Sequence, residues 1–310
     1  MGQKSFSEEL KEKAAFAEAV LKKYTPSPGG FAGRVLEAVE YSVSSGGKHL
    51  RPVIMKEVFD MYGGKGEVIE PFMAAIEFIH NYSLIHDDLP AMDNDMYRRG
   101  KKTTHAVYGE GIATLAGDCL LNLSFETAMK AFDLIPEEAS EKEREILRSR
   151  IIDALRVLFD KSGMNGMLGG QSADVDAEKR GLEVDGDRLI YIHENKTAAL
   201  IEAALVTGGI LGGAKEEDRE KLFKIGSDTG IAFQIKDDIL DVTGDEAKLG
   251  KHVGSDSENG KVTYVTLYGL EKAEKDQREL SLSAVEKLDS LAGDSAFLRE
   301  LISSLVDRES

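Results

Sequence analysis

The chain has one cysteine, six prolines and no tryptophan in 310 residues. A single thiol, Cys119, excludes a disulfide framework and a cysteine-based zinc site, and its apolar context LAGDCLLNLSFE is typical of a buried structural thiol. No apolar run reaches the roughly 18 residues that a membrane span needs. The charged, amphipathic N-terminal segment has neither an apolar signal core nor an arginine-rich transit character. We therefore expect a cytoplasmic protein without a membrane span.

Positive charge is also scarce. The 39 lysines and arginines stand against 56 aspartates and glutamates, which gives a formal net charge of −17. A chain of this charge is not suited to binding a nucleic-acid backbone, so we exclude nucleic acid as a partner. The few places where cations cluster are more informative for the same reason.

Helical periodicity runs through almost the whole chain, and no segment shows the alternation typical of a strand. Polar, glycine-containing turns separate the periodic segments, without a proline-rich linker, a low-complexity tract or a break in composition. We predict an all-α fold, a bundle of about ten or more helices, forming a single domain over residues 1–310. The predicted helices are near 6–24, 31–45, 52–62, 70–88, 110–132, 141–163, 187–206, 217–241, 263–289 and 294–306.

Two aspartate clusters carry the clearest chemical signal, one in HDDLPAMDND and the other in FQIKDDILDVTGD. In the second cluster, Gln234 and three aspartates follow at offsets of 0, 3, 4 and 7, which places them on one helix face. Carboxylates so close together repel one another unless a cation lies between them, and oxygen ligands of this kind suit Mg²⁺ shared with substrate phosphates. A solvated acidic face is the alternative, but both clusters follow apolar helical segments. The candidate carboxylates are Asp87, Asp88, Asp93 and Asp95 in the first cluster and Asp237, Asp238 and Asp241 in the second.

The first cluster is irregular because Pro90 disfavours a helical conformation at Leu89. We expect the helix to end there, with Asp87 and Asp88 at its C-terminal end and Asp93 brought back by a short bulge. Negative charge at that end opposes the helix dipole, which again implies a bound cation.

Basic and polar groups accompany both clusters. Solvated charge runs are the ordinary explanation, but in a chain of net charge −17, cations beside carboxylates suit the binding of polyanions. His80 lies two helical turns before Asp87 on the same face. A flexible loop, GSDSENG, could close like a lid over the site. The cationic and polar candidates are Lys48, His49 and Arg51 in SGGKHLRP, Arg98, Arg99, Lys101 and Lys102 in RRGKK, Gln171 and Asp174 in GGQSADVD, Lys196–Thr197, Lys251 and Lys261.

Together these groups predict two aspartate clusters that bind Mg²⁺ and face each other across a cavity between helices. Cations would lie at the rim of this cavity, and apolar helices would line its lower part. Such a site suits diphosphates that carry hydrocarbon tails. Metal ions and cations there would stabilise a departing pyrophosphate, which is the main barrier to forming an allylic carbocation.

In their order along the chain, the two aspartate motifs, GGKHLRP, RRGKKTTH, GGQSAD, the Lys-Thr pair and LGKHVGSDSENGKVTYV resemble the trans-isoprenyl diphosphate synthases. They look closest to the bacterial farnesyl diphosphate synthases, over residues from about 30 to 270. The resemblance implies an isoprenoid-synthase fold, a homodimer, and three Mg²⁺ ions that Mn²⁺ can replace. It also implies that isopentenyl diphosphate is condensed head to tail with dimethylallyl and then geranyl diphosphate, with release of pyrophosphate.

Residue roles follow from the same resemblance. Asp87, Asp93 and Asp237 are implied to be the principal metal ligands. The aspartates implied to support them at the metal are Asp88, Asp238 and Asp241. The groups implied to act on the reacting centre are Asp87, Asp237, Lys196, Thr197 and Gln234, the last two facing the carbocation. The allylic diphosphate is implied to be held by Arg98, Lys196, Lys251 and Lys261. Isopentenyl diphosphate is implied to be held by Lys48, Arg51, His80 and Arg99.

Two positions depart from the family pattern, with His49 where arginine is usual and Asn94 where aspartate is common; we expect altered affinity rather than lost activity. Product length is predicted to depend on Tyr82 and Ser83, which precede Asp87 by five and four residues. An aromatic residue at the former position marks farnesyl synthases in the resembled family, so we expect a fifteen-carbon product. The alternative is that Tyr82 merely fills the core.

Other functions stay open at this point. Geranylgeranyl or geranyl diphosphate could be the main product. A class I terpene cyclase would need a second motif of a different type from the one that contains Asp241 and Asp245. A di-iron bundle could use the E-x-x-H pair Glu77–His80, but it requires a second such pair, which the sequence lacks. A non-enzymatic helical scaffold would leave both aspartate clusters unexplained.

Overall fold

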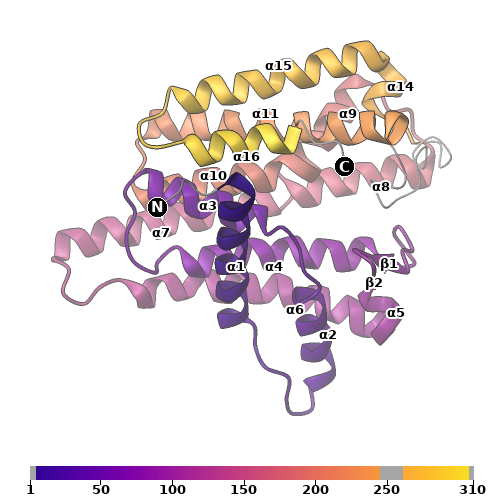
Figure 1. The fold of residues 1–310 in the computed structure, drawn as a ribbon. Helices are drawn as coiled ribbons and strands as arrows, with labels where there is room; N and C mark the ends of the chain where they lie inside the picture. The colour runs from indigo at the N-terminus through magenta and orange to yellow at the C-terminus, as the bar shows by residue number, and fades with distance from the viewer. Residues whose placement is uncertain (1–4, 245–260, 307–310) are drawn as a thin grey trace.

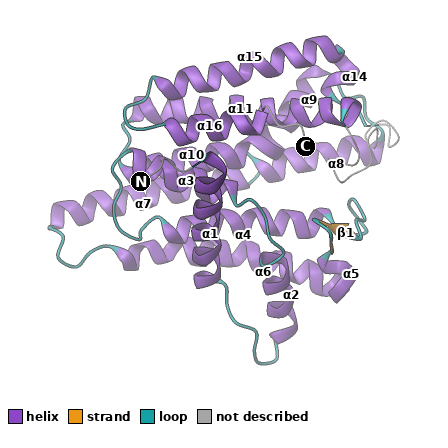
Figure 2. Cartoon of the chain, viewed as in Figure 1, coloured by secondary structure: helices purple, strands orange, loops and turns teal. Residues whose placement is uncertain are grey.

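The computed structural model describes residues 5–244 and 261–306. Helices account for almost all of the regular structure (Figures 1 and 2). The helices of the N-terminal part are α1 (Phe6–Tyr24), α2 (Gly33–Val43), α3 (Leu50–Met61), α4 (Glu70–Asp87), α5 (Thr104–Tyr108), α6 (Glu110–Met129), the 3₁₀ helix η1 (Lys130–Leu134) and α7 (Glu141–Ser162). Those of the C-terminal part are α8 (Met167–Arg180), α9 (Gly186–Ile192), the π-helical turn η2 (His193–Ala198), α10 (Ala199–Gly212), α11 (Glu216–Thr243), α14 (Tyr264–Tyr268), α15 (Leu270–Asp289) and α16 (Ala296–Val306).

The only strands among the described residues are β1 (Tyr97–Arg98) and β2 (Lys101–Lys102), which pair in an antiparallel hairpin after α4. The all-α prediction is therefore confirmed. That residues 1–310 form one domain stays a prediction.

Three details of the helix assignment differ from the prediction. The segment 187–206 is not one helix but α9, η2 and α10. The segment 263–289 divides into α14 and α15 at Gly269, whose φ of 81° lies in the left-handed region that favours glycine. Helix α8 was not predicted at all, because its sequence MLGGQSADVDAEKR contains a glycine pair and only weak apolar periodicity.

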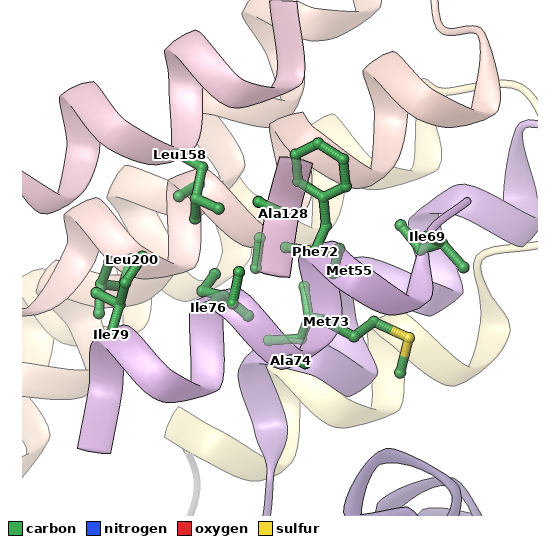
Figure 3. Close-up of a cluster of buried hydrophobic side chains, with 14 of the residues drawn as sticks. Met55, Ile69, Phe72, Met73, Ala74, Ile76, Ile79, Ala128, Leu158 and Leu200 are labelled. Carbon is green, nitrogen blue, oxygen red and sulfur yellow. The ribbon is translucent and has the colours of Figure 1, made fainter. Parts of the chain in front are cut away.

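The core forms around α4 and α10 (Figure 3). All fourteen residues of α10 are buried, and α3, α4, α7 and α11 pack around it. Helix α4 contributes Phe72, Ile76 and Ile79, each with none of its surface exposed. Burial of such side chains contributes about 1.5–3 kcal/mol each, so this layer fixes the orientation of α4 and with it the position of Asp87 at its end.

Several helix ends lie together at one end of the bundle, on the right in Figure 1. The C-terminal ends of α4 and α11 lie there, with the β1–β2 hairpin and α14. Both predicted aspartate motifs are carried by the ends of these two helices. No helix within the described ranges combines the length and apolarity required to cross a membrane.

Helix η2 is held between two glycines of neighbouring helices. A Cβ atom at Gly170 of α8 would lie 2.1 Å from the backbone nitrogen of Lys196, and one at Gly230 of α11 would lie 2.3 Å from Cα of Ala198. Any side chain at either glycine would overlap the backbone of the π turn. Contact this close explains why the glycines occur within helices despite their low helix propensity.

We predict that Gly230→Ala destabilises the protein by about 1–3 kcal/mol, because α11 must move away from η2. Gly111→Ala is the matched control, since a Cβ at that helical position meets nothing within 4 Å. That variant should be neutral or slightly stabilising. The measurement is the melting temperature of each variant, and equal values for the two would contradict the close packing of α11 on η2.

Candidate active site

The first aspartate motif has the backbone geometry expected from Pro90. Helix α4 ends at Asp87, and the chain then turns so that the amide of Asp93 donates to the carbonyl oxygen of Asp87 at 2.9 Å. Asn94 follows in the left-handed region with φ of 56°, a conformation that asparagine tolerates better than most residues. The predicted bulge is thus confirmed, and it returns Asp93 towards the end of α4.

Asp87 is held in place by α8. The Nε2 amide group of Gln171 donates to Oδ1 of Asp87 at 2.7 Å. Burial, opposed by Lys196 and reinforced by Asp93, raises the pKa of Asp87 to about 6. Burial likewise raises the pKa values of Asp88 and Asp93. The negative charges of this cluster are therefore disfavoured in the protein alone, and a bound cation would stabilise them.

Asp88 has a different environment from Asp87. Its side chain is buried, and Oδ1 accepts a hydrogen bond of 2.7 Å from Nε of Arg98. Nη2 of Arg98 also lies 3.5 Å from Oδ2 of Asp95. The β1 strand that carries Arg98 is thereby fixed against the end of α4.

The π turn η2 presents Lys196 and Thr197 to the same region. Nζ of Lys196 lies 2.6 Å from Oδ2 of Asp174 on α8, and Oγ1 of Thr197 donates to Oε1 of Gln234 on α11 at 2.9 Å. Although burial opposes it, the charges of Lys196 and Lys261 hold the pKa of Asp174 below its usual value. A π turn within a helix is frequently found at functional sites, because the extra residue redirects the side chains that follow.

The second aspartate motif lies on α11. Gln234 and Asp237 are half-buried, whereas Asp238 and Asp241 are buried. Oδ2 of Asp238 accepts a hydrogen bond of 2.8 Å from the amide of Tyr264, at the start of α14. Among the described residues, no three carboxylate, imidazole or thiol groups converge closely enough to hold a metal ion alone. Such a site fits Mg²⁺ only if phosphate oxygens and waters complete its shell, which is the usual pattern for this ion.

A second group of cations gathers beside the turn that precedes α3. Nη1 of Arg99 donates to the carbonyl oxygen of Gly46, and a Cβ at Gly47 would lie 2.8 Å from that nitrogen. Nε of Arg51 is buried and has no hydrogen-bond partner within the described part of the chain. Burial and the charge of Arg51 lower the pKa of His80 to about 3, so this imidazole is neutral near pH 7. The structure thus brings Arg51, His80 and Arg99 together, next to the exposed Lys48.

His49 departs from the family pattern and is buried close enough to Arg99 for that charge to act on it. Its φ of 45° is left-handed, and its Nδ1 lies 2.9 Å from Oε1 of Glu77. Burial opposes the charge of the imidazole, but the hydrogen bond to Glu77 raises the pKa of His49 above its usual value. Glu77 is therefore engaged with His49, which argues against its use as an iron ligand.

The two predicted length-determining residues have distinct surroundings. Tyr82 is buried on α4, and its ring packs edge-on against His86 with 5.9 Å between centroids. Burial, with the nearby charge of Asp87, raises the pKa of Tyr82 to about 12, so its hydroxyl stays neutral. The hydroxyl of Ser83 donates back to the carbonyl oxygen of His80 at 2.9 Å.

The remaining predicted residues either lie outside the described part of the chain or are exposed. Lys251, Asp245 and the GSDSENG loop lie outside the described residues. Lys261 is described and exposed, and its charge acts on Asp93, Asp174 and His193. Lys101 and Lys102 lie on the exposed surface of β2.

Sequence reasoning gave no role to several residues that the structure places in the site. Gln171 and Asp174 were noted only because they follow a glycine pair, yet they contact Asp87 and Lys196. Their spacing of three residues would have placed both on one helix face had α8 been predicted. The role of Gly47 beside Arg99 had no signal in the sequence beyond the glycine itself.

Comparison with known proteins is consistent with this arrangement. The family model for polyprenyl synthetase matches residues 33–301. The farnesyl diphosphate synthase of Micrococcus luteus is 41% identical over 291 residues, which is 94% of each chain. The geranylgeranyl diphosphate synthase of Cyanophora paradoxa is 38% identical over 279 residues, covering 90% of this chain and 88% of the relative.

Among solved structures, a geranyltransferase from Helicobacter pylori complexed with magnesium and isoprenyl diphosphate superposes with a TM-score of 0.79. It is 31% identical, and the alignment covers 99% of this chain and 98% of that one. The family match and these alignments both extend over most of the sequence, including the two aspartate motifs. This chain therefore belongs to the polyprenyl synthetase family.

Proposed function

We propose that this protein is a prenyltransferase that condenses isopentenyl diphosphate head to tail with dimethylallyl and geranyl diphosphate, giving farnesyl diphosphate and pyrophosphate. The observation that carries the proposal is a chain of contacts between the helices that hold the two aspartate motifs. On the α4 side, Gln171 of α8 donates to Asp87, and Asp174 of α8 pairs with Lys196 of η2. On the α11 side, Thr197 of η2 donates to Gln234. Membership of the polyprenyl synthetase family supports the reaction class.

Asp87, Asp93 and Asp237 would hold Mg²⁺, with Asp88, Asp238 and Asp241 around them. The raised pKa of Asp87, about 6, supports this assignment, because a dication would remove the electrostatic penalty on the cluster. When bound, the metal supplies Lewis-acid stabilisation of the leaving diphosphate. By resemblance three ions would be present, and Mn²⁺ would substitute. The magnesium in the Helicobacter pylori structure supports the choice of ion.

In the reaction, the allylic C1–O bond breaks and the electron pair leaves with pyrophosphate. Arg98 and Lys196, with Lys251 and Lys261, would bind that diphosphate and stabilise its growing charge. The hydrogen-bonded oxygens of Thr197 and Gln234 would face the carbocation. The double bond of isopentenyl diphosphate then attacks C1, and the proton lost from the new product goes to the released pyrophosphate.

Lys48, Arg51, His80 and Arg99 would hold the isopentenyl diphosphate. Arg51, His80 and Arg99 lie close to one another, which supports a separate site for this diphosphate. They gather near the start of α3 and the turn of the hairpin, and not beside Asp174. A neutral His80 can donate one hydrogen bond to a phosphate oxygen without adding charge.

Farnesyl diphosphate is the product that the buried ring of Tyr82 supports best. Geranylgeranyl diphosphate is the second candidate, because the similar proteins include synthases named for either product. A terpene cyclase is disfavoured by the second group of cations around Arg51, which a reaction without isopentenyl diphosphate would not need.

We also propose a homodimer. The supporting observation is apolar surface on α6 and the adjoining α5, where Val107, Leu115 and Met129 are 41%, 52% and 51% exposed. A second subunit covering these side chains would remove them from water. A cytoplasmic location remains the prediction made from the sequence.

Activity should require Mg²⁺ or Mn²⁺, because carboxylates alone would repel the diphosphates that they must hold. Excess EDTA should abolish turnover in a product assay, and added Mg²⁺ should restore it. Asp87→Ala and Asp237→Ala should each lower turnover by at least about a hundredfold. A loss of only twofold in either variant would mean that its cluster is a solvated face.

The two diphosphates should depend on different cations. Arg51→Ala should mainly raise the KM for isopentenyl diphosphate, because Arg51 lies with His80 and Arg99. Lys196→Ala should mainly lower kcat, because its charge is required as the allylic diphosphate departs. Steady-state kinetics with each substrate varied in turn measures both. If both variants raised only the KM for the allylic substrate, the partition would be wrong.

Tyr82→Ala should shift the product towards twenty carbons. The ring lies about 7.5 Å along the helix axis from Asp87, so removing it opens space for a tail that grows down α4. Ser83→Phe should shorten the product if that side chain also faces the cavity. Chromatography of the prenyl diphosphates measures this. A folded Tyr82→Ala enzyme that still makes only fifteen carbons would show that another residue limits the chain.

A further inference from the structure

A buried carboxylate on α4, that of Glu77, takes no part in the reaction proposed above. Only 3% of its surface is exposed, and its Oε2 has no hydrogen-bond partner within the described part of the chain. Its Oε1 lies 2.9 Å from Nδ1 of His49, which is itself only 6% exposed. A negative charge buried this deeply is costly unless cations compensate it.

The cations that compensate Glu77 lead from the interior to the surface. His49 is buried, Arg51 is half-buried, and Arg99 is exposed in the turn of the hairpin. The charge of Glu77 acts on all three of them. The two arginines belong to the group proposed to hold isopentenyl diphosphate. Glu77 is therefore a counter-charge that those arginines share with His49.

The backbone of the turn before α3 directs His49 inwards. Its φ of 45° lies in the left-handed region, which glycine adopts more readily than a residue with a side chain. The preceding Lys48 is exposed, whereas the imidazole is buried, and Arg51 follows in the first turn of α3. A left-handed residue that is not glycine points to a role for its side chain.

The protonation state of His49 decides how the charge of Glu77 is balanced. Burial lowers the pKa of His49, but the hydrogen bond and the charge of Glu77 outweigh burial and raise that pKa above its usual value. Glu18 of α1 adds to this rise, and Arg99 opposes it. A neutral imidazole can still donate a hydrogen bond to the carboxylate, but it carries no charge. The arginines alone then balance Glu77, and less positive charge remains for a diphosphate.

We propose that His49 is a positioning residue for isopentenyl diphosphate, and that protonation of its imidazole tightens the binding of this substrate. A protonated imidazole balances Glu77, which leaves Arg51 and Arg99 available to the diphosphate. This rests on the proposed function, since that function assigns the diphosphate to the two arginines. Burial holds the pKa of His80, the other imidazole of the group, at about 3, so His80 is not the source of the effect.

Steady-state kinetics at several pH values tests this role. His49→Arg carries a permanent charge, whereas His49→Gln is polar and uncharged. At about pH 6 the unmodified protein should have a KM for isopentenyl diphosphate close to that of His49→Arg. At about pH 9 its KM should approach that of His49→Gln, roughly fivefold higher. Comparing the proteins at one pH cancels the ionisation of the substrate and of Asp87.

The value of kcat should not follow this pattern, because His49 contacts no reacting atom. A residue that only stabilises the fold would change the melting temperature without making the KM cross from one variant to the other. The same pH dependence of KM in all three proteins would overturn the proposal.

A titration followed by NMR needs no turnover, and it tests the unmodified protein directly. The imidazole signal of His49 is the one missing from His49→Gln. If protonation of His49 favours diphosphate binding, bound diphosphate must raise the pKa of His49 by the same factor. Isopentenyl diphosphate added without metal should therefore raise this pKa. A pKa that isopentenyl diphosphate leaves unchanged would overturn the proposal.

The part played by Glu77 has its own variant. Glu77→Gln should lower the pKa of His49, because burial then acts without the carboxylate. Glu57→Gln is the matched control, since Glu57 is also shielded from solvent but pairs with Lys13 of α1 at 2.7 Å. Equal pKa values in the two variants would show that His49 does not act through Glu77.

Failure of the proposed function is distinguishable from failure of this role. If the unmodified protein forms no prenyl diphosphate, the proposed function fails, and the titration with isopentenyl diphosphate still decides the role of His49. An active enzyme in which that titration leaves the pKa of His49 unchanged keeps the function and loses the role.

Discussion

Concentrated negative charge at the C-terminal end of α4 is the constraint on which the rest of the site depends. The aligned peptide dipoles of a helix give its C-terminal end partial negative charge, and Asp87 and Asp88 add to it where burial raises their pKa values. The protein compensates only partly, with a hydrogen bond from Gln171 and an ion pair to Arg98. A dication at this place would stabilise the remaining charge. At a better-solvated position the same aspartates would carry a smaller electrostatic penalty, and a cation would stabilise them less.

Close packing at two glycines holds Lys196 and Thr197 near the aspartates at the end of α4. Lys196 and Thr197 come from a π turn that fits between α8 and α11 only because Gly170 and Gly230 leave no side chain there. The buried helix α10 continues directly from this turn, so the two polar residues are anchored to the best-packed element of the fold. Side chains anchored in this way lose little additional conformational entropy when substrate binds.

Most helices and the class of reaction could be predicted from the sequence. Apolar periodicity indicates helices, and the order of the motifs indicates the chemistry. The end of α4 followed from Pro90, and the position of Gln234 and the aspartates of the second motif on one helix, α11, followed from helical spacing. Helix α8 could not be predicted, since its glycines serve contacts with a segment about 25 residues later and lower its own propensity. Likewise, nothing local in the sequence reveals that His49 pairs with Glu77, a contact between residues 28 positions apart.

The balance of cations and carboxylates differs between the two proposed diphosphate sites. In the site proposed for the allylic diphosphate, Lys196 is paired with Asp174 and its charge also acts on Asp87 and Asp93, so one cation is shared among three carboxylates. In the site proposed for isopentenyl diphosphate, Arg51 and Arg99 both interact with one buried carboxylate, Glu77, which His49 also contacts. The second cradle is therefore attractive to an anion in the protein alone, while the first becomes attractive only with a metal.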